Sequence, residues 1–210
     1  KYEFEQVTTD TESVFADEDT NAVAIVTRHD SHARMVIAAL KGGKHVFVEK
    51  PLCITVDDLE EIEKAIHGSG LHLMVGFNRR FAPQIQKIKS LLSGISAPKS
   101  FVMTINAGFI PKSHWTQDPE VGGGRIVGEA CHFIDLMRFL SGSPIIEWSA
   151  QNMANDSLND KVTINLSFKD GSFGSIHYLA NGSNRFPKER IEVFCGGSII
   201  QLDNFRKMKG

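Results

Sequence analysis

The sequence predicts an α/β fold in which a parallel sheet is followed by a second domain with a largely antiparallel sheet. In the early part of the chain, short apolar runs alternate with segments of helical periodicity, a pattern typical of strand–helix–strand units. From residue 145 onward, alternating strands are separated by tight turns such as Asp170-Gly171. We therefore expect a first domain over residues 1–80 and a second over residues 81–210.

The first domain is predicted from three apolar runs, which we expect to be strands over residues 22–27, 45–48 and 71–75. A short helix over residues 11–16 is expected to precede them. Two further helices are expected between the strands: one stops at Gly42-Gly43, and the other begins after Thr55 with acidic residues in its first turns. Right-handed crossovers make such a sheet parallel. The near-continuous apolar run of the first strand is typical of burial on both faces.

The second domain is predicted from a change of periodicity after Phe77. We expect a helix from Pro83, a strand over residues 99–107, a long loop over 108–124 and a helix over 126–140. Further strands are expected over residues 162–168, 173–179, 190–195 and 199–202. Strict alternation of apolar and polar residues is typical of a strand with one buried face. This half should therefore be an open, largely antiparallel sheet with one covered face.

The composition of the 210 residues argues against several classes of protein. The net charge of -2 disfavours a general nucleic-acid or anionic-membrane binder, and no apolar run approaches the roughly 20 residues that span a bilayer. The three cysteines are far apart, so no disulfide framework is expected. No signal peptide is recognisable, and the cytoplasm is the expected compartment. We expect no metal site, because zinc sites show tighter ligand sets than His114, Asp118, His132 and Asp135.

Polar side chains follow each of the first three predicted strands. They are Thr27, His29 and His32 after the first, Glu49 and Lys50 after the second, and Asn78 and Arg80 after the third. Because the carboxyl ends of parallel strands meet at one edge of the sheet, we expect these groups to share a ligand-binding edge. Pro51 favours an extended backbone at Lys50. The alternatives are a surface salt bridge between Glu49 and Lys50, and helix capping by the other polar residues.

A second candidate site follows the three glycines at residues 122–124. On the predicted helix, Glu129, His132 and Asp135 are spaced by three residues, which places them on one face. A histidine flanked by carboxylates is suited to acid–base chemistry near neutral pH. The alternatives are a solvent-facing polar stripe and a phosphate-binding helix start at the glycines.

Three motifs occur in a fixed order along the chain. The first is the strand–His-x-x-His–helix segment over residues 27–40, which leads to Glu49-Lys50-Pro51. The second is Gly-Phe-Asn-Arg-Arg-Phe at residues 76–81. The third is Trp-x-x-Asp-Pro-x-x-Gly-Gly-Gly from residue 115, followed by His-Phe-Ile-Asp at 132–135. Together they resemble the glucose-fructose oxidoreductase and inositol dehydrogenase family (Gfo/Idh/MocA) and cover nearly the whole chain.

The resemblance implies a Rossmann-like nucleotide-binding domain and a substrate-binding and oligomerisation α+β domain. The implied reaction is hydride transfer between NAD or NADP and a hydroxyl carbon of a sugar, polyol or nucleotide-sugar. Lys50 and His132 would be the catalytic pair, with the choice of base left open, and the Lys50–Pro51 bond would be cis. The cofactor would lie along Thr27, His29, His32, Glu49, Lys50 and Asn78. The substrate would contact Arg80, His114, Trp115, Asp118, Glu129 and Asp135.

Two features depart from the family pattern. The family carries a carboxylate four residues before the catalytic histidine, where this chain has Gly128, and the neighbouring Glu129 is expected to substitute for it. The family's first strand, glycine loop, helix and second strand are not found, so we expect an internal piece of a longer protein, incomplete at its C-terminus as well. Two other functions compete: a redox-assisted glycosidase of the same family, and a non-catalytic module that self-associates through its antiparallel sheet. In either enzyme we expect a homo-oligomer.

Overall fold

The computed structural model describes residues 3–210. The chain divides into two compact units, the first ending at Gly76 and the second running from Phe77 to Gly210. The sequence analysis placed the boundary at residue 80. The intervening short helix η1 (Asn78–Phe81) belongs to the second unit, since its two arginines form their ion pairs there.

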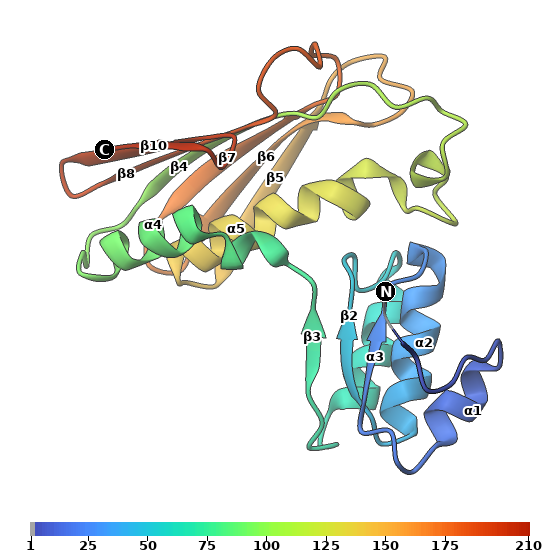
Figure 1. Cartoon of the computed structure of the whole chain (residues 1–210). Helices are drawn as coiled ribbons and strands as arrows, with labels where there is room; N and C mark the ends of the chain where they lie inside the picture. The colour runs from blue at the N-terminus through green and yellow to red at the C-terminus, as the bar shows by residue number, and fades with distance from the viewer. Residues whose placement is uncertain (1–2) are drawn as a thin grey trace. The chain divides into compact units, whose positions relative to one another are not determined.

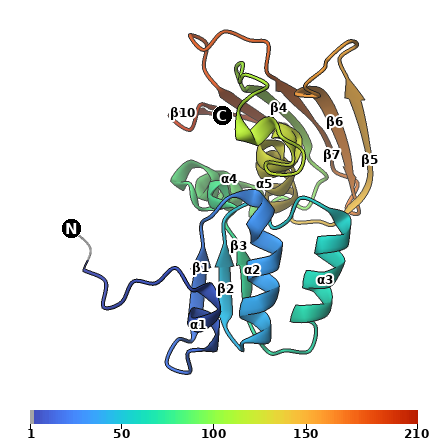
Figure 2. The same ribbon diagram turned by 90° about the vertical axis from the view of Figure 1, so that its right-hand side faces the viewer.

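The first unit is a three-stranded parallel sheet with helices packed on it. The strands are β1 (Ala22–Ile25), β2 (His45–Val48) and β3 (Leu73–Val75), in the order β1-β2-β3. The helices are α1 (Thr11–Ala16), α2 (His29–Lys41) and α3 (Val56–Ile66). α2 and α3 lie side by side against the sheet, as Figure 2 shows. The predicted strand–helix–strand order is confirmed.

One face of this sheet holds the core of the first unit. Val46 and Val48 of β2 are buried against α2, together with Ile25 of β1. The expectation that the first strand is buried on both faces was wrong, because Ala22 and Ala24 are exposed. Among residues 3–210, helices of this unit cover only the face to which Ile25 points. An apolar run alone cannot show whether the second face has a partner.

The second unit contains a seven-stranded sheet with helices on one face (Figure 1). Its strands are β4 (Ser100–Asn106), β5 (Ile145–Asn152), β6 (Lys161–Phe168), β7 (Phe173–Leu179), β8 (Glu189–Cys195), β9 (Ser198–Asp203) and β10 (Lys207–Lys209). Its helices are η1, α4 (Pro83–Ser93), the short η2 (Trp115–Gln117), the π-helix η3 (Ile126–Ala130) and α5 (Cys131–Ser141). The predicted helix over 126–140 is therefore a π-turn that continues into an α-helix.

The strands run in the order β10-β9-β8-β4-β7-β6-β5. β4 comes first in sequence but pairs in the middle, antiparallel to β8 and parallel to β7. The expected largely antiparallel sheet is confirmed, with β4–β7 as a parallel pair. Alternate residues of β4, such as Phe101 and Met103, are buried with α4 and α5, so the expected single covered face is confirmed as well. Among the described residues, no helix is long and apolar enough to cross a membrane.

Candidate active site

The strand ends of the first unit come together at one edge of the parallel sheet. Ile25, Val48 and Val75 are in register across the three strands. The backbone N–H of Glu49 donates to the carbonyl of Ile25 (2.9 Å), and that of Gly76 donates to Val48 (2.8 Å). The segments beginning at residues 26, 49 and 76 therefore leave the sheet side by side, as the sequence predicted for this edge.

His32 ties two of these strand ends together. Its Nδ1 lies 2.7 Å from the carbonyl oxygen of Pro51, and its Nε2 lies 3.1 Å from that of Thr27. The side chain is fully buried. Since both ring nitrogens contact backbone carbonyls, His32 holds these strand ends in place from within. Its predicted contact with the cofactor stays a prediction.

Among the other predicted groups of this edge, Thr27 is exposed, Glu49 and Lys50 are half-buried, and His29 is buried. Thr27 exchanges a 2.6 Å hydrogen bond with Ser31 in the first turn of α2. His29 starts α2, with its ring centroid 5.8 Å from that of His32. The Glu49 carboxylate accepts from the backbone N–H of Lys50 (3.3 Å).

Lys50 is the second residue after β2, the middle strand of the sheet. The Lys50–Pro51 peptide bond is cis, as the family resemblance implied. On the next strand end, a Cβ at Gly76 would come within 3.2 Å of the Glu49 carboxyl group, so a side chain there would require the Glu49 side chain to shift.

In the second unit, His132 lies in the first turn of α5 and is buried. Its ring meets that of Phe77 edge-on, at a centroid distance of 6.2 Å. Asp135, one turn further along, is also buried, with 8% of its surface exposed. The alternative of a solvent-facing stripe is therefore excluded for these two residues.

The Asp135 carboxylate is paired with Arg80. The sequence analysis predicted that both residues contact the substrate. Arg80 forms a two-pronged ion pair with Asp135, Nε donating to Oδ2 at 2.6 Å and Nη2 to Oδ1. The hydrogen bond to Asp135 raises the pKa of Arg80. The neighbouring Arg79 pairs with Glu189 at the start of β8, at 2.6 Å, and its guanidinium lies 4.8 Å from the ring of Phe133. These pairs fasten η1 to α5 and to the sheet.

Glu129 is occupied by a second set of charged partners. Lys188 Nζ donates to Oε1 (2.5 Å), Arg125 Nη2 donates to Oε2 (2.9 Å), and the Tyr178 hydroxyl also donates to Oε2. Burial by itself raises the pKa of Glu129, but hydrogen bonds from the three donors, led by Lys188, outweigh it and lower the pKa to about 2. Burial and the adjacent Glu129 charge raise the pKa of Tyr178. Arg125, Glu129, Tyr178 and Lys188 are called the Glu129 cluster below.

The loop before η3 holds the remaining predicted substrate residues. His114 Nδ1 lies 2.8 Å from the Thr116 hydroxyl, and its ring centroid is 6.0 Å from that of Trp115. Asp118 shapes the turn that follows. Its Oδ1 accepts from the backbone N–H of Glu120 (2.8 Å), and its carbonyl accepts from Gly122 (2.8 Å).

The glycine triplet has a structural explanation. A Cβ at Gly122 would overlap the backbone of Trp115 and Thr116. Gly123 and Gly124 have φ values of 72° and 74°, in the left-handed region that favours glycine. The geometry of this turn accounts for all three glycines without the phosphate that the sequence analysis considered. Within residues 3–210, no group of three or more His, Cys, Asp or Glu side chains is arranged to hold a metal ion.

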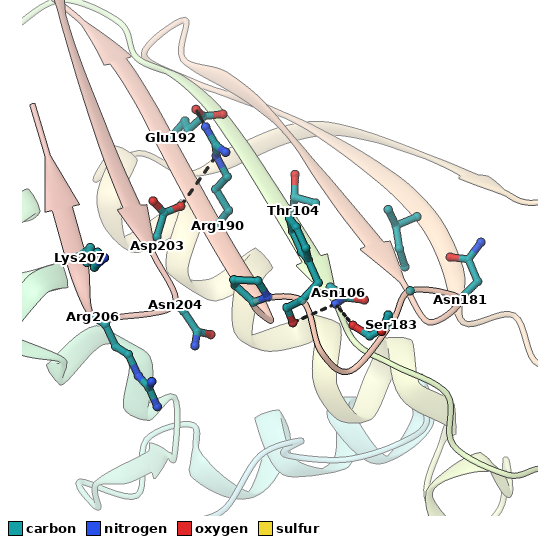
Figure 3. Close-up of a pocket in the computed structure, with 14 residues that line it drawn as sticks. Thr104, Asn106, Asn181, Ser183, Arg190, Glu192, Asp203, Asn204, Arg206 and Lys207 are labelled. Carbon is teal, nitrogen blue, oxygen red and sulfur yellow. Dashed lines mark hydrogen bonds and ion pairs between the residues drawn. The ribbon is translucent and has the colours of Figure 1, made fainter.

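A cavity of about 1020 Å³ opens on the other face of the seven-stranded sheet (Figure 3). Outward-facing Thr104 and Arg190 line it, together with the loop at Ser183, whose carbonyl accepts from Asn106 Nδ2 (2.8 Å). None of the predicted site residues lines this cavity. It is therefore not the site to which the motifs point.

Sequence reasoning missed most of the Glu129 cluster. Arg125 could have been found, because it precedes Glu129 by four residues on a helix, a spacing at which opposite charges meet. Tyr178 occupies an inward position of an alternating strand, where a buried hydroxyl needs a partner. Lys188 gave no local signal, since it is 59 residues away from its partner.

Family models match both units. Residues 1–77 match an oxidoreductase family model described as an NAD-binding Rossmann fold, and residues 86–200 match the GFO/IDH/MocA C-terminal domain. The chain belongs to the Gfo/Idh/MocA oxidoreductase family. The fold and the cofactor class, a nicotinamide dinucleotide, are thereby confirmed as predicted.

Relatives in this family include enzymes of known activity. Myo-inositol 2-dehydrogenase of Thermotoga maritima is 27% identical over 94% of this chain and 61% of its own length. Levoglucosan dehydrogenase of Pseudarthrobacter phenanthrenivorans is 29% identical over 95% of this chain and 60% of its own. A levoglucosan dehydrogenase solved with NADH and levoglucosan superposes with a TM-score of 0.85 at 26% identity, covering 95% of this chain and 58% of that one. The chain thus spans about three fifths of the length of these relatives.

The residues of the first unit fit a nicotinamide dinucleotide. Rossmann-type sheets bind it beyond the carboxyl ends of their strands, and Thr27, Glu49 and Lys50 follow such ends here. Gly76 keeps that edge free of a side chain beside Glu49. This fit concerns one part of the cofactor, because no strand among the described residues is followed by a G-x-G-x-x-G loop.

Proposed function

We propose that the complete protein is an NAD(P)-dependent dehydrogenase acting on a hydroxyl carbon of a sugar or polyol. The main support for this proposal is the position of Lys50, beyond the carboxyl end of the middle strand of an NAD-binding unit. The names of two relatives, a myo-inositol and a levoglucosan dehydrogenase, support a polyhydroxylated substrate. A buried histidine on α5 supplies the second group of the proposed pair.

In the proposed reaction, the bound nicotinamide supplies the acceptor for the hydride. His132 takes the hydroxyl proton on a ring nitrogen. The Lys50 ammonium donates a hydrogen bond to the same oxygen and stabilises its developing negative charge. Thr27 and Glu49 flank the cofactor at the strand ends. Asp135 helps to place the substrate together with Arg80.

The proposal is tested by replacing each member of the pair in the complete protein. NADH formation is followed with myo-inositol and with levoglucosan as probes. Lys50→Met and His132→Gln should each lower kcat by about 10²–10⁴-fold, the usual contribution of acid–base and charge-stabilising groups. His67→Gln, in an exposed position after α3, is the matched control and should retain activity. If Lys50→Met or His132→Gln turned over substrate at the wild-type rate, the proposed catalytic pair would be wrong.

We also propose that the protein self-associates through the outer face of the seven-stranded sheet. Three apolar residues lie in one row across this face. Ser100 of β4 pairs with Phe173 of β7 on one side and with Phe194 of β8 on the other, and Phe194 pairs in turn with Ile199 of β9. These three side chains are 59%, 38% and 53% exposed. An exposed apolar row on this sheet face fits a second copy of the same face.

Ile199→Lys should lower the mass of the complete protein in sedimentation, because the charge would lie inside the proposed interface. Leu91→Lys, on the exposed side of α4, is the control and should leave the mass unchanged. A monomeric wild-type protein, or an unchanged mass in Ile199→Lys, would contradict the proposal.

A further inference from the structure

The Glu129 cluster joins segments that are distant in sequence. Besides Glu129, Arg125 donates to the backbone carbonyls of Gly108 (2.6 Å) and Ala107 (3.0 Å), which begin the loop after β4. Lys188 comes from the loop before β8. Through its two oxygens, Glu129 thus fastens η3 to both loops, and through Tyr178 it fastens η3 to β7.

These connections matter because of where they lie along the chain. The loop after β4 leads to His114, Trp115 and Asp118, which were predicted to contact the substrate. Glu129 itself lies three residues before His132, which is in the first turn of α5. The cluster therefore links the loop that carries predicted substrate residues to the helix that carries the proposed base.

The π-turn adds a geometric reason. η3 spans Ile126–Ala130 and runs directly into α5. Each residue of an α-helix turns the chain by about 100°, so a change of the π-turn to α-helical register would rotate His132 by roughly that angle relative to Arg125. Arg125 precedes this turn and Glu129 lies within it. Their ion pair, together with the contacts of Glu129 to Tyr178 and Lys188 outside the helix, opposes such a rotation.

We propose that Glu129 is a positioning residue that fixes the direction of His132 by holding the π-turn, and that it does not exchange protons with His132. The inference rests on the proposed function for the role of His132. It concerns the family's carboxylate position, which is Gly128 here. A carboxylate that accepts from two cations and a hydroxyl stays ionised throughout the neutral range, so it can neither deliver a proton nor take one.

The structural half of the test uses hydrogen exchange on the 210-residue chain. Glu129→Gln places an amide N–H₂ opposite the donors of Arg125 and Lys188. Faster exchange is expected over residues 107–110, 126–135 and 181–188. Asp170→Asn is the matched control: its carboxylate accepts from Ser172 in the turn before β7, at the far end of that strand from Tyr178. Exchange that is unchanged in Glu129→Gln would overturn the inference, whatever the enzyme's activity.

The catalytic half uses the complete protein with myo-inositol and levoglucosan. Positioning predicts that Glu129→Gln lowers kcat by about 10–100-fold, as misplaced catalytic groups do, while the pH at which kcat/KM declines stays as in the wild type. A proton relay predicts that this limb of the pH profile shifts or disappears, which would overturn the inference. Full turnover of Glu129→Gln alongside faster exchange would overturn it as well.

Lys188 offers a conservative rescue. Lys188→Arg keeps a cationic donor to Glu129 and should retain kcat, whereas Lys188→Met should lower kcat and loosen residues 181–188 in hydrogen exchange. Equal kcat values for the two variants would contradict the positioning role. If His132→Gln proves fully active, the proposed function fails by itself, and the exchange data still decide whether Glu129 holds the turn.

Discussion

The two units arrange their polar groups in different ways. In the first unit, groups at neighbouring strand ends are linked by short contacts, such as those of His32 with two backbone carbonyls. In the second unit, Asp135 and Glu129 are held by cationic side chains that are 55 and 59 residues away. Strand order alone brings the first set together, whereas the second set depends on how a whole domain closes. The second unit should therefore respond more strongly to the loss of one polar group.

The largest expected effect is on the Arg80–Asp135 pair. Asp135→Asn leaves the Arg80 guanidinium without its carboxylate partner. Asp135 is buried but the Arg80 side chain is 32% exposed, so the loss of this two-pronged pair costs about 2–3 kcal/mol of unfolding free energy. Both tryptophans of the chain, Trp115 and Trp148, lie in the second unit, so urea unfolding followed by tryptophan fluorescence reports on it.

The matched comparison is Thr27→Val in the first unit, which removes one exposed hydroxyl contact with Ser31. Hydrogen exchange of α2 should show a loss of less than about 1 kcal/mol. If Thr27→Val lost as much free energy as Asp135→Asn, the two units would not differ in their response to the loss of one polar group.

A smaller effect is expected from acid titration of Glu129. Its pKa is lowered from 4.5 to about 2 in the folded protein. The stabilisation is therefore fully present above pH 4.5 and is lost as the pH falls from 4.5 toward 2. The shift corresponds to at most about 3 kcal/mol, and the partial exposure of Lys188 reduces it.

Glu129→Gln should accordingly show a shallower fall in the unfolding free energy over this pH range, again measured by tryptophan fluorescence. The other carboxylates titrate in both proteins, and their contribution cancels in the comparison. Parallel curves for wild type and Glu129→Gln would mean that the carboxylate gains nothing from its three donors on folding.

The family relationship was readable from the sequence because its motifs are local. The segments containing Lys50, His132 and the glycine triplet each combine a strand or helix signal with a few polar residues, and spacing alone carries that information. The parallel sheet of the first unit followed from the same kind of signal, since alternating strands and helices allow few topologies. In contrast, the exposed second face of β1 could not be read from its apolar run.

The sequence by itself determined the family, the parallel edge that carries Thr27, Glu49 and Lys50, and the helix that carries His132. Only the tertiary structure decided the partners of the carboxylates on and before that helix: Arg80 for Asp135, and Lys188, Arg125 and Tyr178 for Glu129. It also decided that η3 is a π-turn. The physical reason is that secondary structure follows from neighbours along the chain, whereas a buried charge is stabilised by whichever opposite charge the folded chain brings to it.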